Sequence, residues 1–217
     1  MTRATSVRAL VLDFDGVIVE SNALKTLAFE RVFARFPEHA AAMMAYHEAH
    51  VSDSRFVKFR HFATECLGRT ADDPMVEELA AQFSAEMLQL VNACPFVAGA
   101  PELLARLHGR LPMYLASVTP EAELVTILNR RNLVRFFAGV YGCPPWTKSA
   151  AIEDVAAAAG GGPGALLFVG DSAGDQRAAR AAGVEFIARD SGLPFDPPPP
   201  RAFPTLFEIA DIIEARL

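Results

Sequence analysis

Residues 9–17 read Ala-Leu-Val-Leu-Asp-Phe-Asp-Gly-Val, an apolar run that is followed at once by two aspartates. Successive apolar positions predict a strand covered on both faces, as in a parallel α/β sheet. Ligand crevices in such sheets open at the carboxyl ends of strands, where Asp13 and Asp15 stand. Two like charges this close repel each other, which indicates a divalent cation or a reaction that needs both a nucleophile and an acid. Gly16 permits a tight turn and a close approach of the backbone to a ligand, and an ordinary turn is the alternative for this fragment alone.

The bulk composition is that of a soluble globular protein with a sizeable core. The chain has 217 residues, of which 52% are hydrophobic and 21% charged. Three widely spaced cysteines favour a reducing, cytoplasmic setting over a disulfide framework. No apolar run reaches membrane-spanning length, and residues 1–6 lack the core of a signal peptide. A net charge of −6 argues against nucleic acid as a partner, so we expect neither a nucleic-acid nor a membrane partner.

Strand-like and helix-like segments alternate along most of the chain. Apolar runs that read as strands cover residues 7–12, 113–116, 166–169 and 184–188, and helical patterns cover residues 101–107 and 150–159. This alternation predicts an α/β fold, a doubly wound parallel sheet with a Rossmann-like core.

One long stretch interrupts that alternation. Between about residues 21 and 93 the apolar positions recur at helical spacing and no strand pattern is found. Pro and Gly residues between positions 95 and 101 are typical of a linker that returns to the core. We therefore expect a catalytic core of residues 1–19 and 95–217 and an α-helical cap of residues 20–94. The two linkers that join this cap to the core both flank the candidate site, which favours a lid over ordinary helix packing.

A second acidic pair follows the run at 166–169. It consists of Asp171 and Asp175, and if the two strands are neighbours the pair converges on Asp13 and Asp15. Four carboxylates at one crevice require a cation, and Mg²⁺ is the hard, oxygen-seeking ion that fits best. Taken alone, Asp171 is also a candidate N-cap for the helix that follows.

Two more strand ends bring groups that suit an anion. Ser117 and the backbone N–H groups beside it, including that of Val118, are candidates to hold a phosphate, although Ser117 or Thr119 is equally a candidate cap for the next helix. Lys148 lies at the start of a helical pattern, where a positive charge opposes the helix dipole. A bound anion would account for a lysine at that position.

Taken in order, these segments resemble the four motifs of the haloacid dehalogenase-like phosphohydrolase superfamily. The matching residues are Asp13 to Val17, Ser117, Lys148, and Gly170 with Asp171 and Asp175. The helical insert is similar to the small cap of phosphoglycolate phosphatase-like and β-phosphoglucomutase-like members. The resemblance covers essentially the whole chain.

The resemblance implies a role for each motif residue. Asp13 would attack phosphorus to form an aspartyl-phosphate, and Asp15 would protonate the leaving oxygen and then activate water. Mg²⁺ would be held by Asp13, the Asp15 backbone carbonyl and Asp171, with support from Asp175. Ser117 and Lys148 would stabilise charge on the phosphoryl oxygens.

These roles predict an enzyme, a Mg²⁺-dependent phosphoric monoester hydrolase that acts on a small phosphorylated metabolite. Dehalogenase and phosphonatase members of the superfamily lack the second motif aspartate, because they have no alkoxide to protonate, and Asp15 therefore favours phosphate esters. The alternatives are a phosphosugar mutase of the β-phosphoglucomutase type and a non-catalytic binding protein on the same fold.

Cap residues are the candidates for reading the rest of the substrate. Ser54-Arg55 resembles the Ser-Arg of the cap loop in β-phosphoglucomutase-like proteins. We expect Arg55, with Lys25 or Lys58, to bind an anionic or polyhydroxyl part of the substrate, because the guanidinium fork suits a carboxylate or a second phosphate. The alternative is that Arg55 and Lys58, three apart on a helix, face solvent.

Overall fold

The computed structural model describes residues 6–217, so the expectation about the first residues of the chain lies mostly outside the described part. The chain divides into two compact units. One comprises the residues up to Glu20 together with Pro95–Leu217, and the other comprises Ser21–Cys94. Across residues 6–217, no helix has both the length and the apolar character needed to cross a bilayer.

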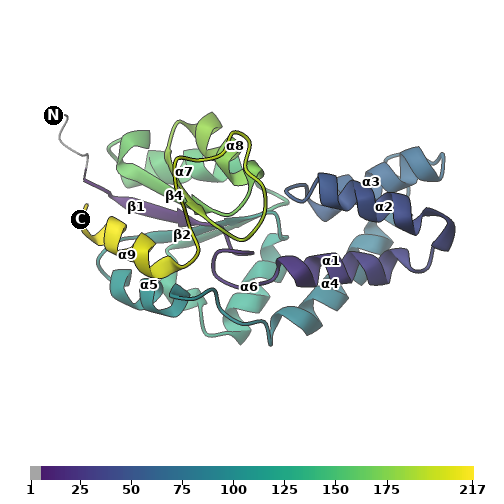
Figure 1. Ribbon diagram of the computed structural model, residues 1–217, viewed down its shortest axis with the longest axis horizontal. Coiled ribbons are helices and arrows are strands. Elements are labelled where there is room, and N and C mark those ends of the chain that lie inside the picture. Colours follow the sequence, from purple (N-terminus) through teal and green to yellow (C-terminus); the bar gives the residue numbers. More distant parts are fainter. Residues whose placement is uncertain (1–5) are drawn as a thin grey trace. The chain divides into compact units, whose positions relative to one another are not determined.

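The first unit, the core, is built on a six-stranded parallel sheet (Figure 1). Its strands are β1 (Ala9–Leu12), β2 (Met113–Ser117), β3 (Gly139–Gly142), β4 (Leu166–Gly170), β5 (Glu185–Arg189) and β6 (Ala202–Phe203). Their spatial order is β3-β2-β1-β4-β5-β6, so the chain winds outward from β1 in one direction and then from β4 in the other. The doubly wound sheet expected from the sequence is confirmed, and its topological switch point lies between β1 and β4.

Helices cover both faces of this sheet. They are α5 (Ala100–Leu107), α6 (Glu121–Arg130), α7 (Lys148–Ala159), α8 (Ala173–Ala182) and α9 (Leu206–Glu214). Figure 1 shows α7 and α8 on one face and α5, α6 and α9 on the other. Side chains of the central strands, such as Val11 and Phe168, pack against Ile152 of α7 in a core without solvent access. Burial on both faces explains why β1 and β4 are apolar at every position.

Two strands were not expected from the sequence. β3 reads Gly-Val-Tyr-Gly, and its first three residues are only half-buried, so it carries no apolar run. It is nevertheless a strand because it pairs in parallel with β2, with Ser117 opposite Gly142. β6 has two residues and pairs only with the end of β5. Both strands depend on a neighbour that is distant in sequence.

The chain leaves and re-enters the core at a paired crossing. Val19 forms an antiparallel bridge with Phe96, and the Glu20 N–H donates to the Pro95 carbonyl at 3.0 Å. The Glu20 carboxylate forms an ion pair with both terminal nitrogens of Arg189, a buried side chain at the end of β5. Glu20, placed with the cap in the sequence analysis, is therefore fastened to the core.

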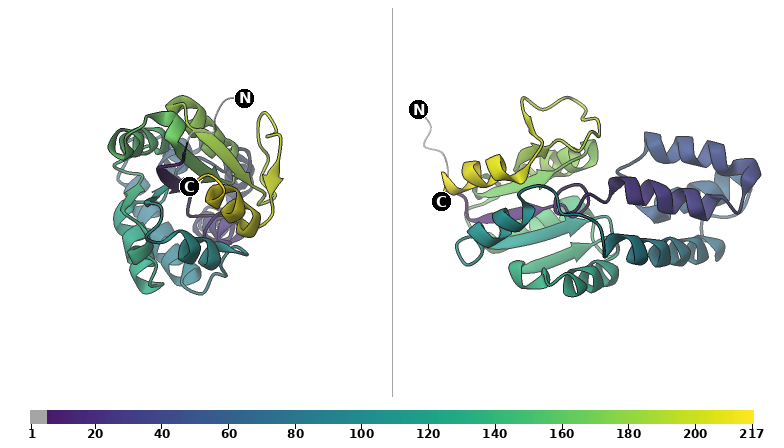
Figure 2. Two further views of the ribbon diagram at one scale, coloured as in Figure 1. Left: turned by 90° about the vertical axis from the view of Figure 1, so that its left-hand side faces the viewer. Right: turned by 60° about the horizontal axis from the view of Figure 1, so that its bottom comes forward.

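The second unit, the cap, is entirely helical (Figure 2). It contains α1 (Asn22–Phe33), α2 (Pro37–Ala49), α3 (Arg55–His61), a π-helical segment (Phe62–Cys66) and α4 (Met75–Val91). Its centre is aromatic, with the Phe29 and Phe83 rings 4.3 Å apart between centroids and Phe33 against Phe59 and Phe62. Ser54 caps α3 by accepting the Val57 N–H.

The cap buries an amine beside an imidazole. Lys58 is 1% exposed, and its Nζ lies 2.8 Å from Nδ1 of His47 and over the Phe29 ring. His47 Nε2 in turn lies 3.1 Å from the hydroxyl of Thr26. Burial, with a contribution from the charge of Lys25, lowers the pKa of Lys58 to about 7. Burial and the charge of Lys58 lower the pKa of His47 to about 4, so near neutral pH Lys58 donates to an uncharged ring.

Lys58 is expected to titrate near pH 7, because its ammonium is desolvated. The chain has only three lysines, so ¹³C-lysine labelling followed by NMR resolves the titration of each Cε signal. Replacing Lys58 with Arg removes one signal and thereby assigns it. A Lys58 midpoint near the ordinary value of 10.5 would show that its surroundings do not desolvate the charge.

The lowered pKa of Lys58 also determines how the free energy of unfolding changes with pH. Between pH 7 and 10.5 the unfolded chain holds a proton on Lys58 that the folded chain has released. The free energy of unfolding therefore rises with pH over this window, by up to about 1.4 kcal/mol per pH unit. The free energy of unfolding, measured with urea at several pH values, should rise less with pH in Lys58→Met than in the wild-type protein. The same dependence on pH in both proteins would contradict the assignment.

Candidate active site

The end of β1 holds Asp13 in a fixed orientation. Its N–H donates to the Val169 carbonyl of β4 at 2.9 Å, which continues the pairing of the two strands. Its Oδ1 accepts the N–H of Phe14 at 2.7 Å. The carboxylate is 5% exposed and lies at the switch point of the sheet, where the sequence predicts a ligand crevice.

Lys148 joins two aspartates that the chain keeps far apart. It is the first residue of α7, whose N-cap is Thr147. Its Nζ lies 2.7 Å from Oδ2 of Asp13 and 2.5 Å from Oδ1 of Asp175. These two carboxylates explain why a cation stands at a helix start, where the dipole disfavours it.

The loop from β4 to α8 is shaped around Asp175. Its Oδ2 accepts the N–H groups of Asp171 and Ser172 and the Ser172 hydroxyl, while Ser172 caps the helix in return. Asp171 is therefore not the N-cap, because Ser172 has that role. A side chain at Gly170 would place its Cβ 2.3 Å from the Cβ of Asp175, so only glycine allows this close approach.

The carboxylate donors fit a hard divalent cation. Oxygens of Asp13, Asp171 and Asp175 lie within 4.8 Å of one another, and all three residues are buried. Burial raises the pKa of Asp13 well above its ordinary value, against the lowering effect of Lys148, and the neighbouring aspartates raise it further. Burial lowers the pKa of Lys148, but Asp13 and Asp175 outweigh it and leave that pKa raised. One ammonium among several carboxylates leaves an excess of negative charge that Mg²⁺ would offset.

The Asp15 side chain belongs to a different contact. Its Oδ2 accepts the hydroxyl of Thr119 at 3.2 Å, and it does not share the cluster formed by the other three carboxylates. Ser117 Oγ accepts the N–H of Thr119 at 3.1 Å. α6 begins at Glu121 after Pro120, with no side-chain cap, so neither Ser117 nor Thr119 caps it. The contact of Thr119 with Asp15 was not predicted from the sequence, in which Thr119 was only a candidate cap.

Two further candidates lie in the turns beside these residues. Gly16 has a φ of 72°, and its N–H donates to the Val19 carbonyl at 2.8 Å, so it shapes the turn after Asp15. Val118 lies between Ser117 and Thr119 and is half-buried. Their roles toward a substrate stay predictions.

The cap candidates lie in the other unit. Arg55 donates to Ser84 Oγ at 2.5 Å and its guanidinium stands 4.5 Å from the centre of the Phe83 ring. Arg55 and Lys58 are both buried, so the alternative in which they face solvent is wrong. The reason is that α4 and α2 supply polar partners, Ser84 and His47, that the spacing on α3 does not reveal. Lys25 is half-buried.

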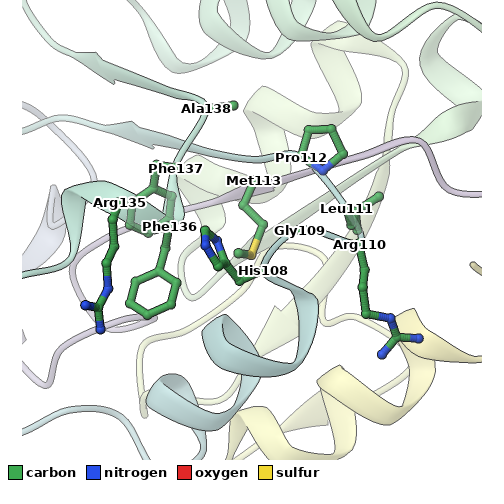
Figure 3. A pocket seen from close by; sticks show the side chains of 10 residues that line it. All are labelled: His108, Gly109, Arg110, Leu111, Pro112, Met113, Arg135, Phe136, Phe137 and Ala138. Carbon is green, nitrogen blue, oxygen red and sulfur yellow. The ribbon is translucent and has the colours of Figure 1, made fainter.

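One cavity of the core lies away from these residues. It has a volume of about 350 Å³ and opens at the starts of β2 and β3, the opposite ends from Ser117 and Gly142 (Figure 3). Its lining includes His108 and Arg135, which contact the Phe136 ring from two sides. Since Asp13 and Asp15 follow the carboxyl end of β1, this cavity is not part of the candidate active site.

Known proteins match the chain in sequence. A family model described as "haloacid dehalogenase-like hydrolase" matches residues 10–189. The phosphoglycolate phosphatase of Synechococcus elongatus is 26% identical over 186 residues, which cover 84% of this chain and 83% of the relative. The phosphoglycolate phosphatase of Pseudomonas putida is 28% identical over 195 residues, which cover 87% of this chain and 71% of the relative.

Solved structures share the fold. A protein from Haemophilus somnus, described as a predicted phosphoglycolate phosphatase, has a TM-score of 0.76 at 18% identity and covers 96% of this chain and 98% of its own. A HAD-superfamily hydrolase of subfamily IA from Geobacter sulfurreducens has a TM-score of 0.65 at 23% identity, with 98% and 99% covered.

The expected family and the expected class of enzyme are confirmed by these matches. The family model spans well over half of the chain, including most of β1, the strands β2 to β5 and the helical insert. Both named curated relatives are phosphoric monoester hydrolases. The chain therefore belongs to the haloacid dehalogenase-like hydrolase family.

Proposed function

We propose that this hydrolase is a Mg²⁺-dependent phosphatase that acts on a small phosphorylated metabolite through an aspartyl-phosphate intermediate. The observation that carries the proposal is the placement of Lys148 between Asp13 and Asp175, with Asp171 beside them. This arrangement combines a buried carboxylate nucleophile with fixed positive charge, which phosphoryl transfer needs.

Asp13 is the proposed nucleophile. One carboxylate oxygen attacks phosphorus, the bond from phosphorus to the ester oxygen breaks, and the departing oxygen takes a proton from Asp15. Water then attacks the aspartyl-phosphate, gives a proton to Asp15 and releases inorganic phosphate, which regenerates Asp13. Lys148 and the Phe14 N–H orient the Asp13 carboxylate before it attacks.

Mg²⁺ would be held by carboxylate oxygens of Asp13, Asp171 and Asp175 together with the backbone carbonyl of Asp15. It would supply positive charge that reduces the repulsion between a carboxylate and a phosphate. Lys148, Ser117 and the Val118 N–H would contact the phosphoryl oxygens on which charge builds. Gly16 contributes through the turn that follows Asp15, since its own N–H is engaged within that turn.

The proposed substrate carries a second anionic group, and a phosphorylated carboxylic acid such as 2-phosphoglycolate is the first compound to test. The support is that the four curated relatives are named phosphoglycolate phosphatase. The cap offers Arg55 and Lys25 for a carboxylate, and a guanidinium can bind one through two hydrogen bonds. Lys58 is less suited to this role, because its buried amine is bonded to His47.

Replacing Asp13 with Asn is expected to lower hydrolysis of phosphate esters by a factor on the order of 10³ or more, because the amide is not a nucleophile. The fold should persist, since Asn keeps the shape and can still accept the Phe14 N–H. Released phosphate and a thermal melt measure the two effects. Asp211→Asn, an exposed carboxylate of α9, is the matched control, and undiminished turnover by Asp13→Asn would rule out the assignment.

Mg²⁺ alone is expected to raise the unfolding temperature of the protein. Binding to the folded state at a hundred times Kd stabilises it by about 2.7 kcal/mol. Asp171→Asn should lose most of this increase, because it removes a carboxylate of the cluster, whereas Asp72→Asn on the cap surface should keep it. An equal rise in both variants would place the metal elsewhere.

Arg55→Ala is expected to raise the KM for 2-phosphoglycolate at least about tenfold. The KM for p-nitrophenyl phosphate, which has no carboxylate, should stay within about twofold of the wild-type value. Ser84→Ala is the matched control, since it removes the same internal hydrogen bond but keeps the guanidinium. A similar change for both compounds, reproduced by Ser84→Ala, would assign Arg55 to cap packing alone.

A further inference from the structure

We propose that Thr119 is a positioning residue that fixes the orientation of the Asp15 carboxyl group. This inference rests on the proposed function, in which Asp15 gives a proton to the leaving oxygen. The two residues are 104 positions apart in the chain and meet because β1 and β2 are parallel neighbours whose carboxyl ends share one edge of the sheet.

The contact is a buried hydrogen bond. Thr119 Oγ1 donates to Asp15 Oδ2 at 3.2 Å, and the two residues are 5% and 4% exposed. Water therefore has little access to replace the hydroxyl. A hydrogen bond to a carboxylate in such surroundings is stronger than one at the surface.

The threonine itself is held on both sides. Its N–H donates to Ser117 Oγ at 3.1 Å, and its carbonyl accepts the Cys143 N–H at 3.1 Å. Gly142 packs against the same carbonyl so closely that a Cβ there would lie 2.7 Å from it. The end of β3 thus packs against the backbone of Thr119. All three polar groups of this residue are engaged, and its branched side chain has few rotamers.

A fixed hydroxyl on one carboxylate oxygen restricts rotation of the Asp15 carboxyl group. The direction in which the other oxygen is presented is then also fixed. General acid catalysis depends on this geometry, because the proton must lie within hydrogen-bond reach of the departing oxygen. Thr119 should therefore matter most where the leaving group needs a proton.

Two phenyl esters of similar shape separate this role from a merely structural one. Phenyl phosphate releases a basic oxygen that needs protonation, whereas p-nitrophenyl phosphate releases a stable anion. The measured quantity is kcat/KM in Mg²⁺, which reports steps up to loss of the leaving group. Thr119→Val should lower kcat/KM at least about tenfold for phenyl phosphate and less than about twofold for p-nitrophenyl phosphate.

Conservative and surface variants complete the test. Thr119→Ser keeps the hydroxyl and should restore the ratio between the two esters. Thr126→Val removes a hydroxyl from α6 that bonds only to the Ala122 carbonyl and should leave both rates unchanged. Thr119→Ala replaces the valine variant if the latter does not fold.

An equal loss for both esters, or no loss in either, would overturn the inference while leaving the phosphatase assignment intact. Failure of the wild-type protein to hydrolyse either ester in Mg²⁺ would instead overturn the proposed function, and this inference with it. The two failures are therefore distinguishable in the same set of assays.

Discussion

The ion pairs of Lys148 are the constraint on which the rest of the core depends. Its ammonium binds one carboxylate that follows β1 and one in the first turn of α8, and Lys148 itself is the first residue of α7. Removal of three charged groups from water costs several kcal/mol each unless they compensate one another. The three groups must therefore lie together in the folded chain, and the neighbouring positions of β1 and β4 in the sheet bring their segments to one point.

Asp175 shows how one side chain serves both structure and site. One of its oxygens completes the N-terminal capping box of α8, and the other accepts a hydrogen bond from Lys148. Gly170 is needed because Asp175 packs directly against its backbone. Local helix chemistry and the charge distribution of the site are thus set by the same residue, so a change there would disturb both.

Features that depend on residues close together in the sequence could be predicted, whereas contacts between distant elements could not. β1 and β4 were predictable because a strand that is buried on both faces has an uninterrupted apolar sequence. The aspartates that follow each of these strands indicated the candidate site. β3 was not predictable, because a half-buried Gly-Val-Tyr-Gly gains its pairing from β2. The contact of Thr119 with Asp15 and the burial of Arg55 were equally hidden, since each depends on a partner in another element.

The bridge between Val19 and Phe96 allows the inserted segment to vary without changing the core around it. The two ends of the inserted segment lie side by side and are tied to the sheet through Glu20 and Arg189. In topological terms the whole cap is an elaboration of one surface loop, and its length adds only slowly to the entropy of closing that loop. Substitution, enlargement or loss of this segment during evolution would therefore leave the chain path of the core sheet unaltered.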